Sequence, residues 1–222
     1  VEKFSEQYNT ILEAMTNKFG SDNIIFEHGV AYEEHKEWTA EDASGIEKAV
    51  AQAKDVDYII ACVGENSYAE TTGNISDLNL SSNQKLLVKR LQETGKPVIL
   101  ILNEGRPRLI HDLVDGCKAI VNIMLPGNYG GDALADLLSG DENFSGRLPF
   151  TYPSHPNSFT TYDFKVCEAR ETMPGTYNYE AHTNTQWWFG EGMSYTTFEY
   201  SNLEINKSSF DAGDIIEFSI MV

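Results

Sequence analysis

The chain has 222 residues, of which 41% are hydrophobic and 11% aromatic, a composition typical of a folded protein with one core of ordinary domain size and part of a second. Its formal net charge of −18 argues against a basic face for nucleic acid or for an anionic membrane surface, so we expect neither partner. The longest apolar runs, at 58–63 and 98–102, are far shorter than the roughly 20 residues that span a bilayer, which argues against membrane insertion.

The first third of the chain predicts helices and strands in alternation. Apolar residues recur at steps of three and four over 1–19, which indicates one amphipathic helix that ends at Gly20. A short buried strand is expected at 23–26. Helical spacing resumes in a segment that begins at 39–42 and continues to 53, and the run YIIACV at 58–63 predicts a buried strand.

The same alternation continues to about residue 140. Ser81, followed three residues later by Gln84, forms a possible capping box at the start of a helix that stops at Gly95. Continuous apolar strands separated by amphipathic helices predict an α/β fold, with a mostly parallel sheet covered by helices on both faces. The further elements expected are strands at 98–102 and 119–125 and a helix at 132–138.

The texture of the sequence changes after Gly140. The segment GRLPFTYPSHP is rich in proline and turn residues, which predicts a wrapping strand and a long surface connection. The last 25 residues alternate apolar and polar side chains around two turn signals, at 206–209 and 211–213. This pattern predicts two strands of an antiparallel sandwich that the chain does not finish.

Cysteine and histidine spacing predicts no metal site. The three cysteines lie far apart without a CxxC pair, and the histidines also lack ligand spacing, so we expect no zinc site, no disulfide framework and no cofactor. Two of the cysteines lie in or beside apolar runs and are expected to be small buried hydrophobes. These two are Cys62 and Cys117; the third is Cys167.

An acidic loop follows the strand predicted at 58–63. The segment GENSYAETTG, residues 64–73, contains Glu65, Tyr68 and Glu70 and closes on Gly73. In an open α/β sheet, ligands bind beyond the carboxyl ends of the strands. Two carboxylates and an aromatic ring suit sugar chemistry, because a glycosidic bond needs a proton donor and the sugar needs a ring face to pack on. The alternative is that both glutamates are only solvent-facing residues of a long loop.

A glycine-rich turn, PGNYGGDA at 126–133, could be read as a phosphate cradle at a helix start. It lacks GxGxxG spacing, the lysine of a P-loop and any basic residue. We therefore favour a tight strand-to-helix turn in which glycines permit close packing.

Four ordered blocks carry a family resemblance. Together they look like the second domain of family three glycoside hydrolases of the β-glucosidase type. The blocks are VGENSYAETTGNISDLNL at 63–80, ILNEGRPRLI at 101–110, LPGNYGGDALADLLSGDENFSGRLPFTYP at 125–153 and FGEGMSYTTFEYSNL at 189–203.

The resemblance implies a role for each residue of the acidic loop. In this family a (β/α)8-type barrel supplies an aspartate nucleophile, and the following α/β sandwich supplies the acid/base glutamate in an E-T-x-G context. That context matches Glu70 here, with Glu65 as the reserve. We expect Tyr68 to bind substrate, Gly73 to let the loop turn back, and Asp77 to pin the loop by local hydrogen bonds.

The implied activity is exo-acting, retaining hydrolysis of terminal β-linked sugars, with the barrel domain of the same protein as partner and a periplasmic or secreted location. The implied parts are an α/β sandwich over 1–160 that lacks its first strand, a wrapping connection over 161–198, and the truncated start of a fibronectin type III-like domain over 199–222. Glu191 and Tyr129 depart from the family pattern, which leaves the sugar and linkage open. A non-catalytic carbohydrate-binding or scaffolding module is the alternative.

Overall fold

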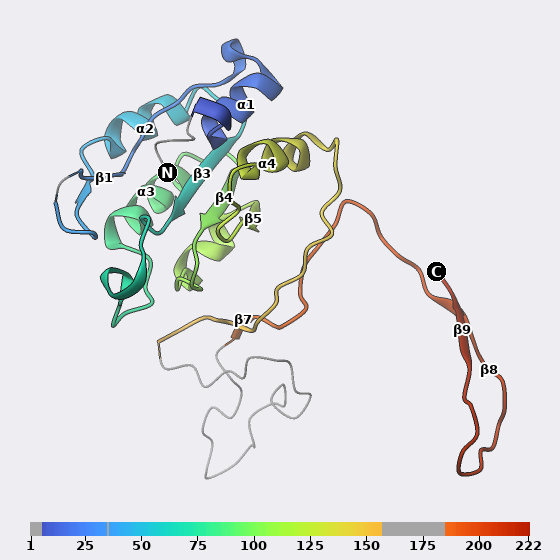
Figure 1. Cartoon of the computed structure of the whole chain (residues 1–222). Helices are drawn as coiled ribbons and strands as arrows, with labels where there is room; N and C mark the ends of the chain where they lie inside the picture. The colour runs from blue at the N-terminus through green and yellow to red at the C-terminus, as the bar shows by residue number, and fades with distance from the viewer. Residues whose placement is uncertain (1–5, 35, 157–184) are drawn as a thin grey trace, which may run out of the picture.

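The computed structural model of the chain describes residues 6–34, 36–156 and 185–222, and Figure 1 shows its course. Its centre is a parallel sheet of β3 (Ile59–Gly64), β4 (Val98–Asn103) and β5 (Ala119–Asn122), in that order. Ile59 lies opposite Val98 in the register of the first pair. All three strands coincide with predicted apolar runs, so the α/β fold class is confirmed.

Helices cover both faces of this sheet (Figure 1). On one face α2 (Ile46–Ala53) and α3 (Ser82–Gln92) share a core with alternate residues of β3 and β4. On the other face α1 (Ile11–Phe19) and α4 (Gly130–Ser139) pack on the intervening residues of the strands. Successive side chains of a strand point to opposite faces, so each apolar run contributes side chains to the core on either face of the sheet.

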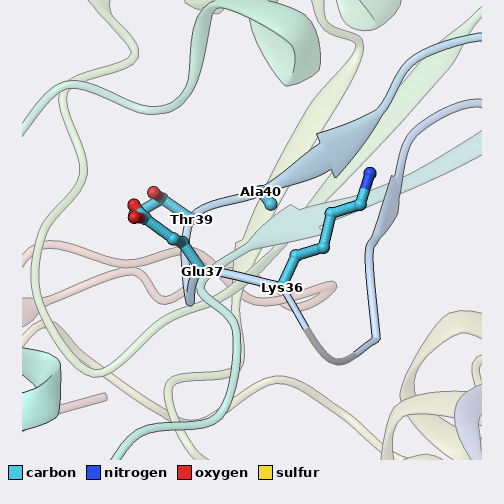
Figure 2. Close-up of a pocket in the computed structure, with 4 residues that line it drawn as sticks. All are labelled: Lys36, Glu37, Thr39 and Ala40. Atoms are coloured by element: carbon cyan, nitrogen blue, oxygen red, sulfur yellow. The ribbon is translucent and has the colours of Figure 1, made fainter.

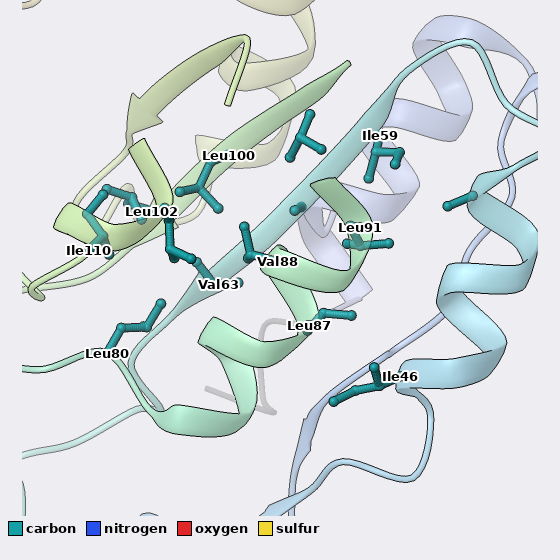
Figure 3. Close-up of a cluster of buried hydrophobic side chains, with 14 of the residues drawn as sticks. Ile46, Ile59, Val63, Leu80, Leu87, Val88, Leu91, Leu100, Leu102 and Ile110 are labelled. Atoms are coloured by element: carbon teal, nitrogen blue, oxygen red, sulfur yellow. The ribbon is translucent and has the colours of Figure 1, made fainter. Parts of the chain in front are cut away.

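The larger core lies between α3 and the sheet (Figure 3). Val88, Leu100 and Leu102 have no exposed surface there. Burying one such side chain contributes about 1.5–3 kcal/mol, so this layer stabilises the sheet substantially.

The N-terminal elements differ from the prediction. α1 begins only at Ile11, because the Thr10 hydroxyl accepts the backbone N–H of Glu13 while the Glu13 carboxylate accepts that of Thr10, a capping box that fixes the helix start. The strand predicted at 23–26 is wrong. Ser21–Asn23 form a 3₁₀ turn, and the Ile25 side chain is 54% exposed. Residues 24–26 take part in none of the described strand pairings, and an apolar run without backbone pairing is not a strand.

The helix predicted from 39–42 also starts later. Residues Glu41–Asp42 form β2, which pairs antiparallel with β1 (Ala31–Tyr32). The Asp42 carboxylate accepts the backbone N–H of Ser44, so it caps a turn between β2 and α2 instead of the helix itself. The hairpin places the 33–40 segment beside the acidic loop.

Two further predictions need correction. Cys62 is exposed: alternation along β3 puts it on the same face as Ile60, but it lies outside the cluster of side chains buried there. Cys117 is half-buried against the larger core, and Cys167 lies outside the described residues. β5 ends at Asn122 instead of continuing to 125, because Met124 has a positive φ of 51° that breaks the extended backbone.

The C-terminal part contains two small antiparallel pairs. β6 (Tyr152–Pro153) pairs with β7 (Thr185–Trp187), so a short strand lies in the proline-rich segment, and its wrapping role stays a prediction. β8 (Ser201–Ile205) pairs with β9 (Phe218–Met221), and every residue of both strands is exposed. A fibronectin type III-like sandwich stays a prediction. Across the described ranges, no helix has the length and apolar character needed to cross a membrane.

Candidate active site

Three loops meet at the carboxyl edge of the sheet. The acidic loop leaves β3 at Gly64, and the backbone N–H of Glu65 is bound by the carbonyl of Asn103, the last residue of β4. The loop after β5 joins them, since the backbone N–H of Glu104 donates to the carbonyl of Met124. This edge is where an open α/β sheet binds ligands.

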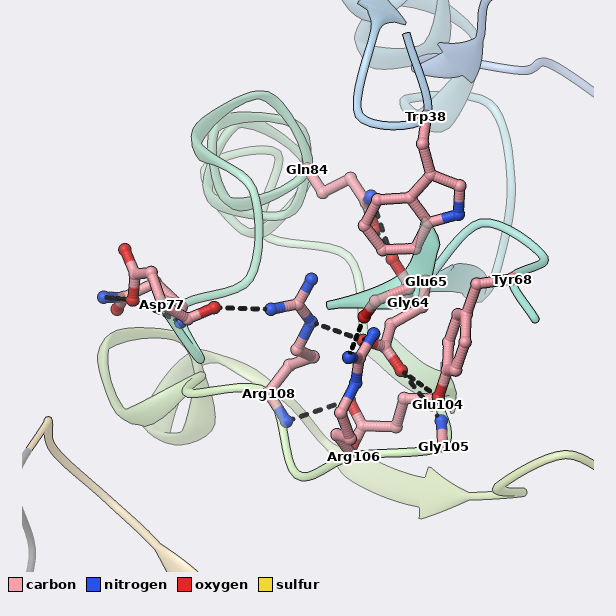
Figure 4. Close-up of polar contacts among 12 residues, drawn as sticks. Trp38, Gly64, Glu65, Tyr68, Asp77, Gln84, Glu104, Gly105, Arg106 and Arg108 are labelled. Atoms are coloured by element: carbon pink, nitrogen blue, oxygen red, sulfur yellow. Dashed lines mark hydrogen bonds and ion pairs between the residues drawn. The ribbon is translucent and has the colours of Figure 1, made fainter. Parts of the chain in front are cut away.

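Glu65 lies at the centre of a buried ionic cluster (Figure 4). Only 1% of its side chain is exposed. Its Oε1 accepts from Nε of Arg106 at 2.9 Å and lies 3.1 Å from Nε of Arg108. Its Oε2 accepts the backbone N–H of Gly105 at 3.0 Å and the Tyr68 hydroxyl at 3.3 Å. Both carboxylate oxygens are therefore occupied by donors of this chain, which is the arrangement of an anchoring group.

Glu70 has the opposite environment. It is exposed, and it opens the short 3₁₀ helix η3 (Glu70–Gly73). In the described part of the chain, no side chain or backbone group binds its carboxylate. Its φ of 51° falls in the left-handed region that few non-glycine residues adopt, so neighbouring contacts must hold the backbone there. A free carboxylate at the tip of a fixed loop can exchange a proton with a bound molecule.

Tyr68 packs inside the loop. The Arg106 guanidinium lies 4.2 Å from the centre of its ring, and the Trp38 ring meets it edge to face at 5.7 Å. A side chain at Gly73 would overlap the Tyr68 ring, so the absent Cβ of Gly73 is what makes room for the aromatic residue. The ring and hydroxyl of Tyr68 thus contact other residues of this chain. Among the predicted site residues, Glu65, Tyr68 and Gly73 lie in contact, and Glu70 makes no contact with them through its carboxylate.

Asp77 organises the far end of the loop. Its carboxylate accepts both the backbone N–H and the side-chain amide of Asn79, at 2.9 and 2.8 Å. The backbone hydrogen bond from Asn79 is the main cause that lowers the pKa of Asp77. The Asp77 carbonyl also accepts from Nη1 of Arg108 at 2.9 Å, which ties this end of the loop to the segment after β4.

Glu104 is a buried carboxyl that the sequence analysis missed. It is 1% exposed, and burial raises its pKa to about 7, with the nearby Glu65 charge adding to the effect. The Tyr152 hydroxyl lies 2.8 Å from Glu104 Oε1 and 2.6 Å from the carbonyl oxygen of Arg108. A hydroxyl has one proton and can donate to only one of these acceptors. The second contact is satisfied when Glu104 itself carries a proton, in agreement with its raised pKa.

Sequence reasoning also missed the two arginines and Trp38. The segment NEGRPR follows β4 and reaches the same sheet edge as the acidic loop, a signal that was available. Trp38 gave no such signal, because it lies just before the helix start predicted at 39–42 and belongs to no predicted element. Its indole N–H donates to the Ser67 carbonyl at 2.8 Å, and its own carbonyl accepts from the Asn66 amide.

A hollow of about 720 Å³ lies on the same segment as Trp38 (Figure 2). One short stretch of chain lines it, and Figure 2 shows the Lys36 side chain directed away from Glu37 and Thr39. A small-molecule site usually gathers polar groups from several elements, so we do not assign one here. The described residues contain no group of three or more His, Cys, Asp or Glu side chains that could hold a metal ion. The lining residues are Lys36, Glu37, Thr39 and Ala40.

The glycine-rich turn before α4 is a packing device. A Cβ at Gly131 would lie 2.8 Å from the Thr10 carbonyl oxygen and 2.9 Å from that of Asn9, so this glycine allows α4 to meet the start of α1. Asp132, in the first turn of α4, accepts from the Asn9 amide at 2.8 Å. Carbonyl oxygens and a carboxylate occupy this helix end, which makes it a poor place for a phosphate.

These features define an α/β domain that displays a free glutamate on an anchored loop, at the ligand-binding edge of a parallel sheet. The model of the Glycosyl hydrolase family 3 C-terminal domain matches residues 3–195. The chain belongs to this family, so the resemblance carried by the four sequence blocks is confirmed.

Similar proteins agree with this assignment. A lysosomal beta glucosidase of Dictyostelium discoideum is 39% identical over 201 residues, which are 90% of this chain and 23% of that protein. A periplasmic beta-glucosidase of Salmonella typhimurium is 30% identical over 184 residues, 80% of this chain and 24% of that protein. The solved structure of a β-glucosidase from Erythrobacter marinus superposes with a TM-score of 0.72 at 26% identity, covering 95% of this chain and 31% of that one. The chain thus spans about a quarter of the length of these curated relatives.

Proposed function

We propose that this chain supplies the acid/base residue, Glu70, to an exo-acting retaining β-glycosidase that hydrolyses terminal β-linked sugars. The observation that carries the proposal is the contrast between the two glutamates of the acidic loop. Glu65 is buried with both oxygens occupied, whereas Glu70 is exposed and free of described partners. Only the second arrangement suits a group that contacts substrate.

Retaining hydrolysis needs a second carboxylate. We assign the nucleophile to an N-terminal catalytic domain of the same protein, placed about 5 Å from Glu70 across the scissile bond. Glu70 would carry a proton when substrate binds and give it to the departing oxygen. It would then take a proton from the water that attacks the glycosyl-enzyme. The substrate class we propose is β-glucosides or closely related β-glycosides.

The remaining parts of the chain fit the same enzyme. We propose that residues 1–160 form the α/β sandwich that completes the active site, that 161–198 wrap it, and that 199–222 begin a fibronectin type III-like domain. The exposed apolar side chains of the β8–β9 hairpin support the last assignment, because an isolated two-stranded hairpin is only marginally stable. The location we propose is periplasmic or secreted.

Glu70→Ala in the full-length protein tests the proposal. Substrates with poor leaving groups need a proton at departure, so their kcat/KM should fall by about 10²- to 10⁴-fold, while activated aryl glycosides lose far less. Azide needs no general base and should restore turnover with the activated substrate, giving a β-glycosyl azide.

The control is Glu142→Ala, which removes another exposed glutamate, in the turn after α4. It should leave both substrates unaffected. Equal losses on both substrates for Glu70→Ala, without azide rescue, would mean that the acid lies elsewhere. Full activity of Glu70→Ala would favour the non-catalytic binding module.

A further inference from the structure

Two arginines from the segment after β4 hold the acidic loop at its base and bind the chain again at Gly73 and, just beyond the loop, at Asp77 (Figure 4). Arg106 donates from Nη1 to the carbonyl of Gly73, the last residue of η3. Arg108 donates from Nη1 to the carbonyl of Asp77 at 2.9 Å. Both guanidinium groups also reach Oε1 of Glu65, where the loop begins. Glu70 lies between these fixed points.

We call Arg106 and Arg108, together with Glu65, the arginine clamp. The three side chains are largely shielded from water, so their contacts hold one arrangement. The side chains of Arg106 and Arg108 are 25% and 11% exposed. Their charges face the Glu65 carboxylate inside the protein, where charge-assisted hydrogen bonds are strong and water does not replace a lost partner. Any shift of one arginine therefore moves the loop carbonyl that it binds.

Arg106 is the more constrained of the two arginines. Its guanidinium lies 4.2 Å from the centre of the Tyr68 ring and 6.0 Å from that of Trp38, so two aromatic rings fix its plane. From this position it binds Glu65 and Gly73 at the same time. Gly73 is three residues after Glu70, in the same helical turn. A lysine has a single ammonium group and cannot reproduce this fork.

We propose that Arg106 is a positioning residue, which sets the Glu70 carboxylate for proton transfer through the Gly73 carbonyl and the Tyr68 ring. The inference rests on the proposed role of Glu70. In this role Arg106 acts through Glu70 and does not itself transfer the proton; it holds the turn whose first residue adopts the left-handed backbone conformation. A displacement of about 1 Å at a reacting group can cost about 10²-fold in rate, so a small movement of this turn is enough to matter.

The test compares Arg106→Lys and Arg106→Met in the full-length enzyme with poor and activated leaving groups. Arg106→Lys keeps the charge beside Glu65 but loses the bond to Gly73. We expect its kcat to fall about 10- to 100-fold on a poor leaving group and less than about threefold on an activated aryl glycoside, with KM and thermal midpoint near those of the parent. Arg106→Met should lower the thermal midpoint as well, so the lysine variant separates positioning from folding.

A double variant shows whether the effect passes through Glu70. In a Glu70→Ala background, Arg106→Lys should add no further loss that depends on the leaving group. Arg90→Met is the matched control, since Arg90 also binds a glutamate with two nitrogens, at Glu47, but on the surface of α2 and α3. This control should behave like the parent on both substrates.

Each result decides one question. If Glu70→Ala shows the leaving-group dependence and Arg106→Lys does not, the positioning role is wrong and the acid assignment stands. The positioning role is also wrong if Arg106→Lys costs as much in the Glu70→Ala background as in the parent. If Glu70→Ala itself lacks the dependence, the proposed function fails first, and the positioning role fails with it.

Discussion

Glu104 should make the stability of the chain fall as pH rises from 5 to 8. Burial raises the pKa of this carboxyl to about 7 in the folded chain, against 4.5 for an unperturbed glutamate. Between these two values the folded state holds a proton that the unfolded state has lost. The free energy of unfolding therefore decreases with pH over this window, and the stabilisation by the protonated form is complete only below about 4.5.

The magnitude follows from the size of the shift. The raised pKa corresponds to roughly 3 kcal/mol of stability, since a tenfold change in proton affinity is about 1.4 kcal/mol. Most of this loss, roughly 2–3 kcal/mol, falls between pH 5 and pH 8. The groups that act on Glu104 are Tyr152, Asn122, the Glu65 carboxylate, and both the backbone N–H and the guanidinium of Arg108, whose positive charge opposes the effect of burial.

Glu104→Gln tests this reasoning, because glutamine imitates the protonated carboxyl and does not titrate. Urea unfolding of the parent and the variant at pH 5 and pH 8 gives four free energies. We expect the variant to gain roughly 2–3 kcal/mol relative to the parent between the two pH values, whatever its stability at pH 5. If the two proteins instead lose stability in parallel, Glu104 is ionised in both states and the proton inferred between it and Tyr152 is absent.

Three other substitutions have consequences that unfolding measurements can check. Glu65→Ala should cost about 3–5 kcal/mol, because it leaves two buried guanidinium groups without their carboxylate. Gly73→Ala should cost about 1–3 kcal/mol and change the near-ultraviolet circular dichroism, since the new methyl overlaps the ring of Tyr68. Thr10→Ala should cost about 1 kcal/mol by removing the cap that binds the Glu13 N–H of α1.

Two control variants keep these tests specific. Glu47→Ala removes the carboxylate of a surface ion pair whose own side chain is 72% exposed, and it should cost less than about 1 kcal/mol. Gly146→Ala adds a methyl where no atom lies within 4 Å, so it should be close to neutral. A Glu65→Ala variant as stable as Glu47→Ala would show that water reaches the arginines, and a neutral Gly73→Ala would show that the Tyr68 ring can move aside.

The sequence predicted the strands and most helices of the sheet because their signals are local. β4 is a continuous apolar run bounded by turn residues, and this pattern can be recognised without knowing which other segments contact it. The segment at 23–26 has the same texture but forms no strand. An apolar run is a strand only when another backbone lies alongside it, and the run itself does not contain that fact.

The acidic loop shows a second limit of the same kind. Glu65 and Glu70 are five residues apart in one loop, and sequence patterns alone give both the chemistry of a candidate acid. What separates them is contributed by Arg106 and Arg108, some 40 positions further along the chain, which occupy one glutamate and leave the other free. The contacts that distinguish an anchored glutamate from a free one therefore come from a distant segment, and the sequence of the loop itself does not contain them.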